Sequence, residues 1–305
     1  GLIKGLFISK QIKPKAILLQ PDSFFVMLFF KFMFKTVILY KPLDEYPPPI
    51  LKNRANSLWG ILYMKFYYLS FNCIICISES LEAYIKNECN VKDTIVVNMT
   101  VEIDRFKIRE TKVQKCICYA GNMGMNNKDG IFDLILAFAR IAYNHKDWSL
   151  KLIGDVSNID PKQKQSIKNI LDEYKIKDRV IFVGKANYEE IPNLLSQASI
   201  LALTRPSNIQ SEVSFPTKLG EYLAAGKPVL VTKFGEIEKF IINKFNGYLA
   251  DPSNIEDISK QFDYIISHPE EWGYISNNAQ KLVFEQFNYV TEAKKIINYI
   301  EGHNA

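Results

Sequence analysis

Apolar runs alternate with helical patterns along almost the whole chain. Short runs rich in β-branched and aromatic residues are separated by stretches whose apolar positions recur at helical spacing. This alternation is typical of βαβ units, in which crossover helices join parallel strands. Six strands with intervening helices predict a complete doubly wound sheet, and four predict an incomplete one. The predicted strands are residues 16–19, 36–40, 73–77 and 94–98, followed by 115–119, 149–153, 179–183, 199–203, 228–232 and 247–249.

The two sets of strands predict two α/β domains. A polar stretch, residues 102–114, lies between the sets and is where we expect the linker. The N-terminal domain is therefore predicted over residues 1–108 and the C-terminal domain over residues 109–280. A last helical pattern over about residues 276–301 predicts a long helix, whose part in residues 281–305 packs back on the N-terminal domain.

Charge is distributed unevenly along the 305 residues, of which 48% are hydrophobic and 23% charged. Residues 1–108 contain 14 Lys and Arg against 9 Asp and Glu, whereas residues 109–305 contain 24 of each. The whole formal charge of +5 thus lies in the N-terminal third. This excess is too mild for a dedicated nucleic-acid-binding protein, but it suggests an anionic surface as a partner.

The most apolar stretch runs from Phe24 to Tyr40 and is interrupted by Lys31 and Lys35. Because it is shorter than the ~20 apolar residues of a spanning helix, we expect a helix over about 23–33 and then a strand. Two interpretations of that helix stay open. It fills the N-terminal core, or it rests on an anionic membrane with its lysines at the lipid phosphates. No signal peptide is visible, so we expect a cytoplasmic protein, with peripheral attachment to the inner membrane face under the second interpretation.

Cysteine and histidine spacing does not favour a metal site. Cys73 and Cys76 have the spacing of a ligand pair, but they lie in an apolar run and no second pair follows. The three histidines are scattered. We expect reduced, buried thiols, as in a cytosolic protein, and no metal or cofactor.

Residues 215–232 predict a short helix that leads directly into a buried strand. Pro216 suits the first helical position, and Gly226 suits the position just after the helix. Lys218 lies in the first turn and Glu221 one turn further along. The free amides and partial positive charge of a helix N-terminus favour an anion there. On spacing alone, an ordinary amphipathic helix with a Lys218–Glu221 pair is an equally good interpretation.

Glycine-rich turns follow three further predicted strands. The first holds Gly121, Gly124 and Gly130, with Lys128 as a point charge suited to a phosphate. Strands 149–153 and 179–183 also end in glycine, and such strand ends meet at one edge of a parallel sheet. As a bare pattern each turn is weak, since none is a G-x-G-x-x-G or Walker sequence.

Together these motifs resemble the retaining GT-B glycosyltransferases of the GT4 family. The segment from Phe215 to Val229 resembles that family's donor-site motif, and the segment from Tyr119 to Gly130 looks like its phosphate loop. Residues 97–106 are similar to the segment that closes the family's N-terminal domain. Residues 77–84 and 44–47 also fit their usual places. The resemblance implies a GT-B fold of two Rossmann-like domains facing a cleft, with the N-terminal one incomplete because its opening strands are absent.

The resemblance also implies roles for individual residues. Glu221 would hold the nucleotide ribose, Lys128 and the amides from Thr217 to Leu219 would neutralise the diphosphate, and Asp44 or Glu45 would face the donor. The implied catalytic residues are Asp44, Glu45 and Lys128. The implied donor-binding residues are Gly121, Asn122, Lys128, Gly184, Lys185, Arg205, Glu212, Pro216, Thr217, Lys218, Leu219 and Glu221.

The implied activity is transfer of a sugar from a nucleotide-diphosphate sugar to a glycan or lipid-linked acceptor, with retention, in surface polysaccharide biosynthesis. Two departures from the family pattern bear on it. Val213 stands where a sugar-contacting carboxylate is common, with Glu212 beside it, and Asn122 stands where a basic residue is common. A non-catalytic, nucleotide-binding GT-B protein is therefore the alternative. A GT-B epimerase is a weaker one, because it needs further acid and base residues.

Overall fold

The computed structural model describes residues 14–19, 29, 31–33, 38–107, 112–124 and 128–302, without the side chains of residues 38–40, 158 and 210. The chain divides into two compact units. Unit 1 comprises residues 1–98, 213–215 and 292–305, and unit 2 comprises residues 99–212 and 216–291. Each unit contains one parallel β-sheet. None of the helices in the described ranges is long and apolar enough to cross a membrane.

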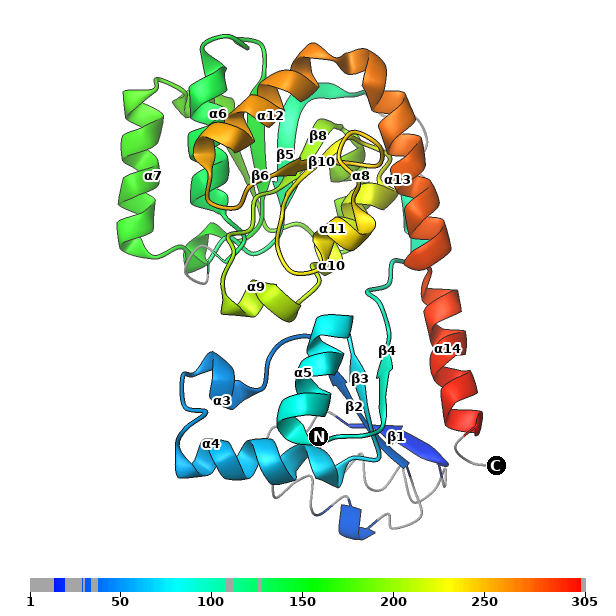
Figure 1. Ribbon diagram of the computed structural model, residues 1–305. Helices are drawn as coiled ribbons and strands as arrows, with labels where there is room; N and C mark the ends of the chain where they lie inside the picture. The colour runs from blue at the N-terminus through cyan, green and yellow to red at the C-terminus, as the bar shows by residue number, and fades with distance from the viewer. Residues whose placement is uncertain are drawn as a thin grey trace. The chain divides into compact units, whose positions relative to one another are not determined.

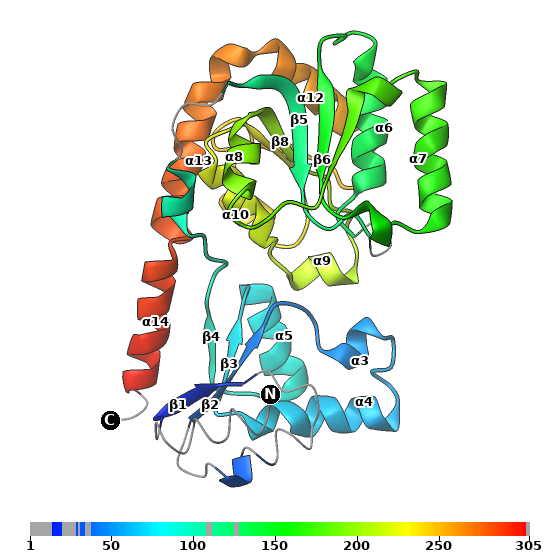
Figure 2. The ribbon, with the colours of Figure 1, turned by 180° about the vertical axis from the view of Figure 1, so that it is seen from behind.

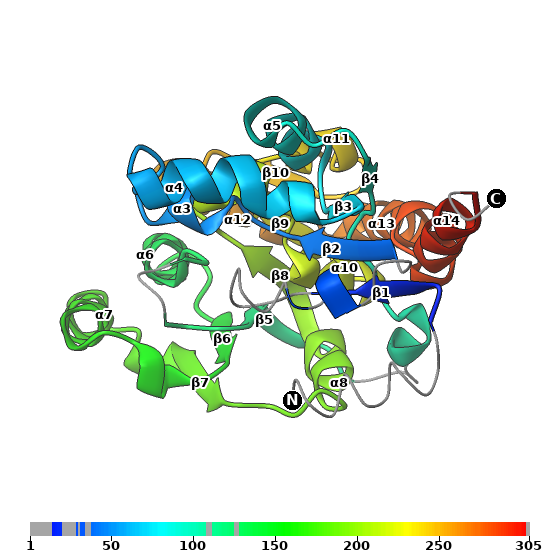
Figure 3. The same cartoon turned by 90° about the horizontal axis from the view of Figure 1, so that it is seen from below.

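Unit 1 is built on a four-stranded sheet in the order β1-β2-β3-β4, which Figure 3 shows from below. Its core gathers aromatic and aliphatic side chains such as Tyr67, Tyr68, Ile74 and Leu81. The strands are β1 (Ala16–Leu18), β2 (Ile38–Leu43), β3 (Cys73–Cys76) and β4 (Thr94–Val96). The helices are α3 (Pro48–Leu51), α4 (Leu58–Leu62), the π-helix η1 (Tyr63–Tyr67), the 3₁₀ helix η2 (Tyr68–Ser70), α5 (Glu79–Cys89) and most of α14 (Tyr289–Gly302).

Two local features fix the helices of unit 1. Ser78 caps α5, because its hydroxyl oxygen accepts a hydrogen bond from the Leu81 amide at 3.1 Å. The same hydroxyl donates to the Val213 carbonyl at 2.6 Å, which anchors residues 213–215 in this unit. At the other end of the chain, Tyr299 and Ile300 of α14 pack against the strand β3.

Unit 2 is built on a six-stranded parallel sheet in the order β10-β9-β8-β5-β6-β7. Helices α6, α7 and α12 lie on one face of the sheet and α8, α10 and α13 on the other (Figures 1 and 2). The strands are β5 (Gln114–Ala120), β6 (Ser149–Ile153), β7 (Val180–Gly184), β8 (Ala198–Leu203), β9 (Val229–Thr232) and β10 (Tyr248–Ala250). The α-helices are α6 (Ile131–Ala142), α7 (Pro161–Glu173), α8 (Ile191–Ser196), α9 (Ile209–Val213), α10 (Thr217–Ala224), α11 (Ile237–Phe240), α12 (Ile255–Ser267) and α13 (Trp272–Gln286). Short helices are η3 (Ile103–Phe106), η4 (Val156–Asn158), η5 (Lys177–Arg179) and η6 (Pro269–Glu271).

Glycine sets the start of α6. Gly130 caps this helix at φ +70°, and a Cβ there would lie 1.8 Å from the Thr204 carbonyl oxygen. Any other residue would therefore force the β5–α6 loop away from the end of β8. This close approach places the loop that follows β5 next to the end of β8.

The α/β class with two Rossmann-like parallel sheets is confirmed, and each predicted strand has a counterpart. The strand expected over 36–40 corresponds to β2, which continues to Leu43, and residues 36 and 37 lie outside the described ranges. The prediction of a single helix over residues 276–301 is wrong. The chain forms α13 and α14 instead, because the Phe287 carbonyl accepts the Val101 amide (2.8 Å) and the Asn288 side chain accepts the Val290 amide (3.0 Å).

The predicted ends of α10, the helix expected over 23–33 and the predicted domain limits have different outcomes. Pro216 is the N-cap of α10 and not its first residue, because its extended ψ of 112° keeps it outside the helix. Gly226 follows the helix at φ +66°, as predicted. Of the helix expected over 23–33, the described residues 29 and 31–33 are helical, and the rest lies outside the described ranges. The domain limits at 108 and 280 stay predictions.

Candidate functional site

The carboxyl ends of three strands meet at one edge of the unit 2 sheet. The Gly121 amide after β5 donates to the Ile153 carbonyl of β6 at 2.8 Å, and the Gly154 amide donates to the Gly184 carbonyl at the end of β7 at 2.8 Å. These backbone bonds hold the glycine turns side by side. The glycine turns thus lie together at the carboxyl ends of the strands, which is the edge where ligands of such sheets bind.

Lys218, in the first turn of α10, reaches this edge and is paired there. Its ammonium forms an ion pair with Asp129, whose side chain is 8% exposed. It also lies 3.3 Å from the Tyr119 hydroxyl, which is 2.7 Å from Asp129 Oδ2. Burial, reinforced by the Asp129 charge, raises the pKa of Tyr119, so the phenol stays neutral. A Cβ on Gly121 would lie 2.5 Å from the Tyr119 hydroxyl and 2.6 Å from the Lys218 ammonium, so any other residue there would displace these groups.

Glu221, one turn further along α10, is paired with Arg105 of η3. The Arg105 Nη1 donates to Glu221 Oε1 at 3.1 Å, and the Glu221 side chain is 29% exposed. Arg105 also donates to the Tyr188 carbonyl, and its guanidinium lies 3.2 Å from the centre of the Tyr188 ring. Within the described residues, neither Glu221 Oε2 nor Arg105 Nε has a hydrogen-bond partner. The arrangement leaves one carboxylate oxygen and one buried N–H group for a ligand.

The Lys218–Glu221 pair, which was the alternative interpretation of this helix, does not form. Each residue takes a partner distant in the sequence, Asp129 for Lys218 and Arg105 for Glu221. Sequence reasoning missed Arg105, Asp129, Tyr119 and Tyr188 as parts of the site. The signal for Arg105 was present, because it lies in the segment 97–106 that had been singled out.

Other predicted donor residues line the same strand ends. Lys128 lies one residue before Asp129 and has no ion pair among the described residues. Lys185 follows Gly184 and is exposed. Thr217 and Leu219 belong to the first turn of α10, and the Leu219 amide donates to the carbonyl of the N-cap residue Pro216 at 3.0 Å. Asn122 is exposed after β5, and its side chain accepts the Gly124 amide at 2.9 Å.

Arg205 and Glu212 lie in the segment that follows β8. Arg205 is 5% exposed, lies 5.4 Å from the centre of the Phe234 ring, and its carbonyl accepts the Thr232 hydroxyl at 2.6 Å. Glu212 is exposed near the end of α9, whereas Val213 is 2% exposed and packs into the core of unit 1. Buried Val213 is therefore part of the packing of that unit.

Asp44 and Glu45 lie in unit 1, directly after β2. Asp44 is exposed and Glu45 is half-buried. They therefore follow the carboxyl end of a strand, where ligand-binding side chains of parallel sheets are found. Their assignment to catalysis stays a prediction.

No group of three or more His, Cys, Asp or Glu residues suited to a metal ion occurs among the described residues. All five cysteines are free and buried, as expected. Burial raises the pKa of Cys73 to about 11 and that of Cys76 and Cys89 to about 12. These thiols are therefore protonated at neutral pH.

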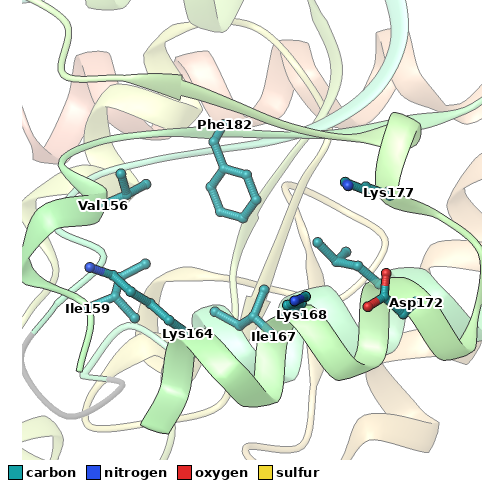
Figure 4. A pocket seen from close by; sticks show the side chains of 9 residues that line it. Val156, Ile159, Lys164, Ile167, Lys168, Asp172, Lys177 and Phe182 are labelled. Carbon is teal, nitrogen blue, oxygen red and sulfur yellow. The ribbon is translucent and has the colours of Figure 1, made fainter. Parts of the chain in front are cut away.

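A separate cavity of about 490 Å³ lies between α7 and β7 (Figure 4). Ile167 and Lys168 of α7 face Phe182 of the edge strand across it. None of the predicted donor residues lines this cavity. It is distinct from the strand-end site.

Two Rossmann-like parallel-sheet units, with glycine turns and paired charges at the carboxyl edge of the second sheet, define the GT-B class of α/β proteins. Residues 100–282 match the family model described as glycosyl transferases group 1. The chain belongs to this family.

Relatives of known sequence and structure are similar to this chain. An uncharacterized glycosyltransferase of Methanocaldococcus jannaschii is 27% identical over 192 residues, which is 61% of this chain and 44% of that protein. The lipopolysaccharide 1,2-N-acetylglucosaminetransferase of Salmonella typhimurium is 26% identical over 182 residues, 59% of this chain and 46% of that protein. The chain thus spans about half the length of the curated relatives it matches.

A solved structure of similar fold is the HepE protein of Anabaena in complex with UDP. It has a TM-score of 0.79 and 16% identity, and the alignment covers 99% of this chain and 82% of that one. At this identity the likeness establishes the GT-B fold.

Proposed function

We propose that this protein is a glycosyltransferase that takes its sugar from a nucleotide-diphosphate sugar. The observation that carries the proposal is the strand-end cluster of unit 2, where the Gly121 turn, Lys218 and Glu221 meet. Membership of the glycosyl transferases group 1 family supports it.

In the proposed complex, Glu221 accepts a hydrogen bond from a ribose hydroxyl. Its Oε1 is held by Arg105, so Oε2 is the oxygen that remains to accept. The buried Nε of Arg105 is a second group that a bound nucleotide could satisfy. Gly184 and Lys185 would lie near the base, in the segment that leads to Tyr188, which Arg105 contacts.

The diphosphate would be neutralised at the N-terminus of α10 and by Lys128. The amides of Thr217 and Lys218 supply donors, since the Leu219 amide already donates to the Pro216 carbonyl, and the helix dipole adds partial positive charge. Lys218 shares its charge with Asp129, so Lys128 is the stronger candidate for direct phosphate contact. Substitution of each lysine can therefore distinguish the phosphate contact of Lys128 from the ion pair of Lys218.

In the proposed reaction, the bond between the anomeric carbon and the diphosphate oxygen breaks while the acceptor hydroxyl forms the new bond. The electron pair of the broken bond goes to the diphosphate, where amides and Lys128 stabilise the developing charge. The acceptor hydroxyl loses its proton, and Asp44 or Glu45 is our candidate to receive it. We propose retention of the anomeric configuration and no metal ion.

The proposed acceptor is a glycan or a lipid-linked sugar in surface polysaccharide biosynthesis. The name of the Salmonella typhimurium relative, a lipopolysaccharide transferase, supports this class of acceptor. A cytoplasmic enzyme attached to the inner face of the membrane would meet such an acceptor. The excess positive charge of residues 1–108 supports an anionic lipid surface as a partner, with no role for nucleic acid.

The second candidate is a GT-B protein that binds nucleotides without turnover. The burial of Val213, at the position where a carboxylate often touches the sugar, favours it. Incubation with UDP-, GDP- and ADP-sugars, followed by mass spectrometry of released nucleotide and products, separates the two. Nucleotide release from one donor supports the transferase. Tight binding without release of any nucleotide, with a panel of glycan and lipid-linked acceptors present, supports the second candidate.

A further inference from the structure

A continuous helical rod in unit 1 packs one side into the core. The rod comprises α4, η1 and η2, which follow one another without a break from residue 58 to residue 70. Gly60, Met64, Tyr67 and Tyr68 lie on its inner side, each 9% exposed or less. The core therefore fixes which side of the rod faces outward.

The outer side of the rod is apolar. Counted from residue 58, its exposed positions follow at intervals of 1, 3, 4, 7, 8 and 11 residues, which is one face of a helix. Lys65 is the charged residue among them. A helix facing water ordinarily carries polar side chains at these positions, whereas this helix carries apolar ones. Its large apolar side chains are Leu58 (76% exposed), Trp59 (50%), Ile61 (51%), Leu62 (48%), Phe66 (47%) and Leu69 (45%).

A second exposed segment of unit 1 lies against the end of the rod. The Lys31 ammonium donates to the Leu69 carbonyl at 3.5 Å, which places residues 31–33 beside η2. Phe32, next to Lys31, is 71% exposed. The apolar surface therefore extends from the rod onto this segment.

The charge of this region has a single sign. No Asp or Glu occurs from residue 46 to residue 78, whereas Lys52, Arg54 and Lys65 are present and exposed. A second copy docked about a two-fold axis would bring these positive charges together. An anionic surface is the complementary partner.

We infer that the outer face of residues 58–70 is a docking surface for an anionic lipid bilayer. Trp59, Leu62 and Phe66 enter the boundary between headgroups and acyl chains, and Lys65 reaches the lipid phosphates. The surface is centred on residues 58–70, and it includes Phe32 of the segment Phe24–Tyr40 that the sequence suggested. It does not depend on the donor chemistry, and under the proposed function it would hold the enzyme beside a lipid-linked acceptor.

Vesicle sedimentation tests the inference directly. The chain should bind vesicles that contain phosphatidylglycerol, bind less in high salt, and bind weakly to pure phosphatidylcholine. Replacing both Leu62 and Phe66 by Gln should lower partitioning about tenfold or more. Lys65→Glu should lower it about fivefold or more, since it reverses one charge at the surface.

Matched variants in unit 2 serve as controls. Tyr143→Gln removes a side chain that is 82% exposed, and Lys162→Glu reverses the charge of an exposed lysine that has no ion pair among the described residues. Both should leave vesicle binding unchanged. Circular dichroism and nucleotide titration of every variant verify that the fold and the strand-end site are intact.

Fluorescence reports on the depth of contact. Trp59 lies 5.2 Å from the Tyr63 ring and is half-exposed, so lipids with brominated acyl chains should quench it on binding. Trp59→Phe should abolish that quenching while the protein still sediments with vesicles. Quenching that persists in Trp59→Phe would place the contact elsewhere and overturn the inference.

Two further results would contradict the docking surface. One is that the wild type does not bind anionic vesicles at low salt, or that the rod variants and the unit 2 controls lose vesicle binding equally. The other is a dimer that Phe66→Gln converts to a monomer, without any vesicle binding, which would make the face a self-association surface. Failure to bind nucleotides would refute the proposed function and leave the vesicle result standing.

Discussion

Replacing Glu221 by Ala tests the ribose contact that the site geometry indicates. Glu221 is 29% exposed, and its Oε1 lies 3.1 Å from Arg105 Nη1. Loss of a hydrogen bond to a charged acceptor costs about 1.5–3 kcal/mol, which corresponds to a tenfold to hundredfold weaker affinity for a ribonucleoside diphosphate. The folded state should survive, because Arg105 keeps its contacts with the Tyr188 carbonyl and ring.

Isothermal titration calorimetry with two ligands makes this prediction specific. The wild type should prefer the ribonucleoside diphosphate over its 2′,3′-dideoxy counterpart, which lacks the hydroxyls that Glu221 would bind. Glu221→Ala should lose that preference and bind both equally weakly. Glu221→Gln is the matched control for shape and should retain part of the preference. An unchanged preference in Glu221→Ala would refute the ribose contact.

Arg105 should act through Glu221 in the same assay. In a double-mutant cycle, Arg105→Ala combined with Glu221→Ala should cost less affinity than the sum of the single changes, because the residues share one interaction. Additive losses would show that the ion pair does not position the carboxylate.

Three further predictions concern charges and thiols. Lys128→Ala should weaken binding of a nucleoside diphosphate much more than that of the nucleoside in calorimetry, and equal losses would exclude a phosphate contact. Lys218→Met should lower the free energy of unfolding in urea by about 2–4 kcal/mol, because it leaves the carboxylate of Asp129 buried without its partner; an unchanged midpoint would contradict this. Since burial raises the pKa of Cys76 and Cys89 to about 12, the folded protein should resist alkylation by iodoacetamide at pH 8 and react after unfolding in urea. Mass spectrometry follows the labelling, and equal labelling rates in the folded and unfolded protein would refute the burial argument.

The order of strands and helices along the chain could be predicted from the sequence, because local patterns determine it. Buried strands such as Ala198–Leu203 are continuous apolar runs, and Gly226 stands where a helix must end. The partner of each charge at the site was not accessible. Spacing on a helix favours Lys218 with Glu221, but Lys218 pairs with Asp129, 89 residues away, and Glu221 with Arg105, 116 residues away. Such pairs depend on the tertiary fold, which brings the end of β5 and η3 to α10.

The break at Phe287 has a similar cause. Helical spacing continues through residues 276–301, so the pattern alone predicts one helix. The bond from the Val101 amide to the Phe287 carbonyl is long-range and therefore carries no local signal. Tertiary contacts thus decided the ends of elements, whereas local patterns decided their existence.

The central claim is that the strand-end site of unit 2 binds a nucleotide-diphosphate sugar for transfer. The most direct test is nucleotide release from a panel of UDP-, GDP- and ADP-sugars, measured for the wild type, Glu221→Ala and the control Tyr143→Gln. The account predicts release from at least one donor by the wild type and the control, and a tenfold to hundredfold lower kcat/KM for Glu221→Ala. Release that is equally fast in Glu221→Ala would contradict the account.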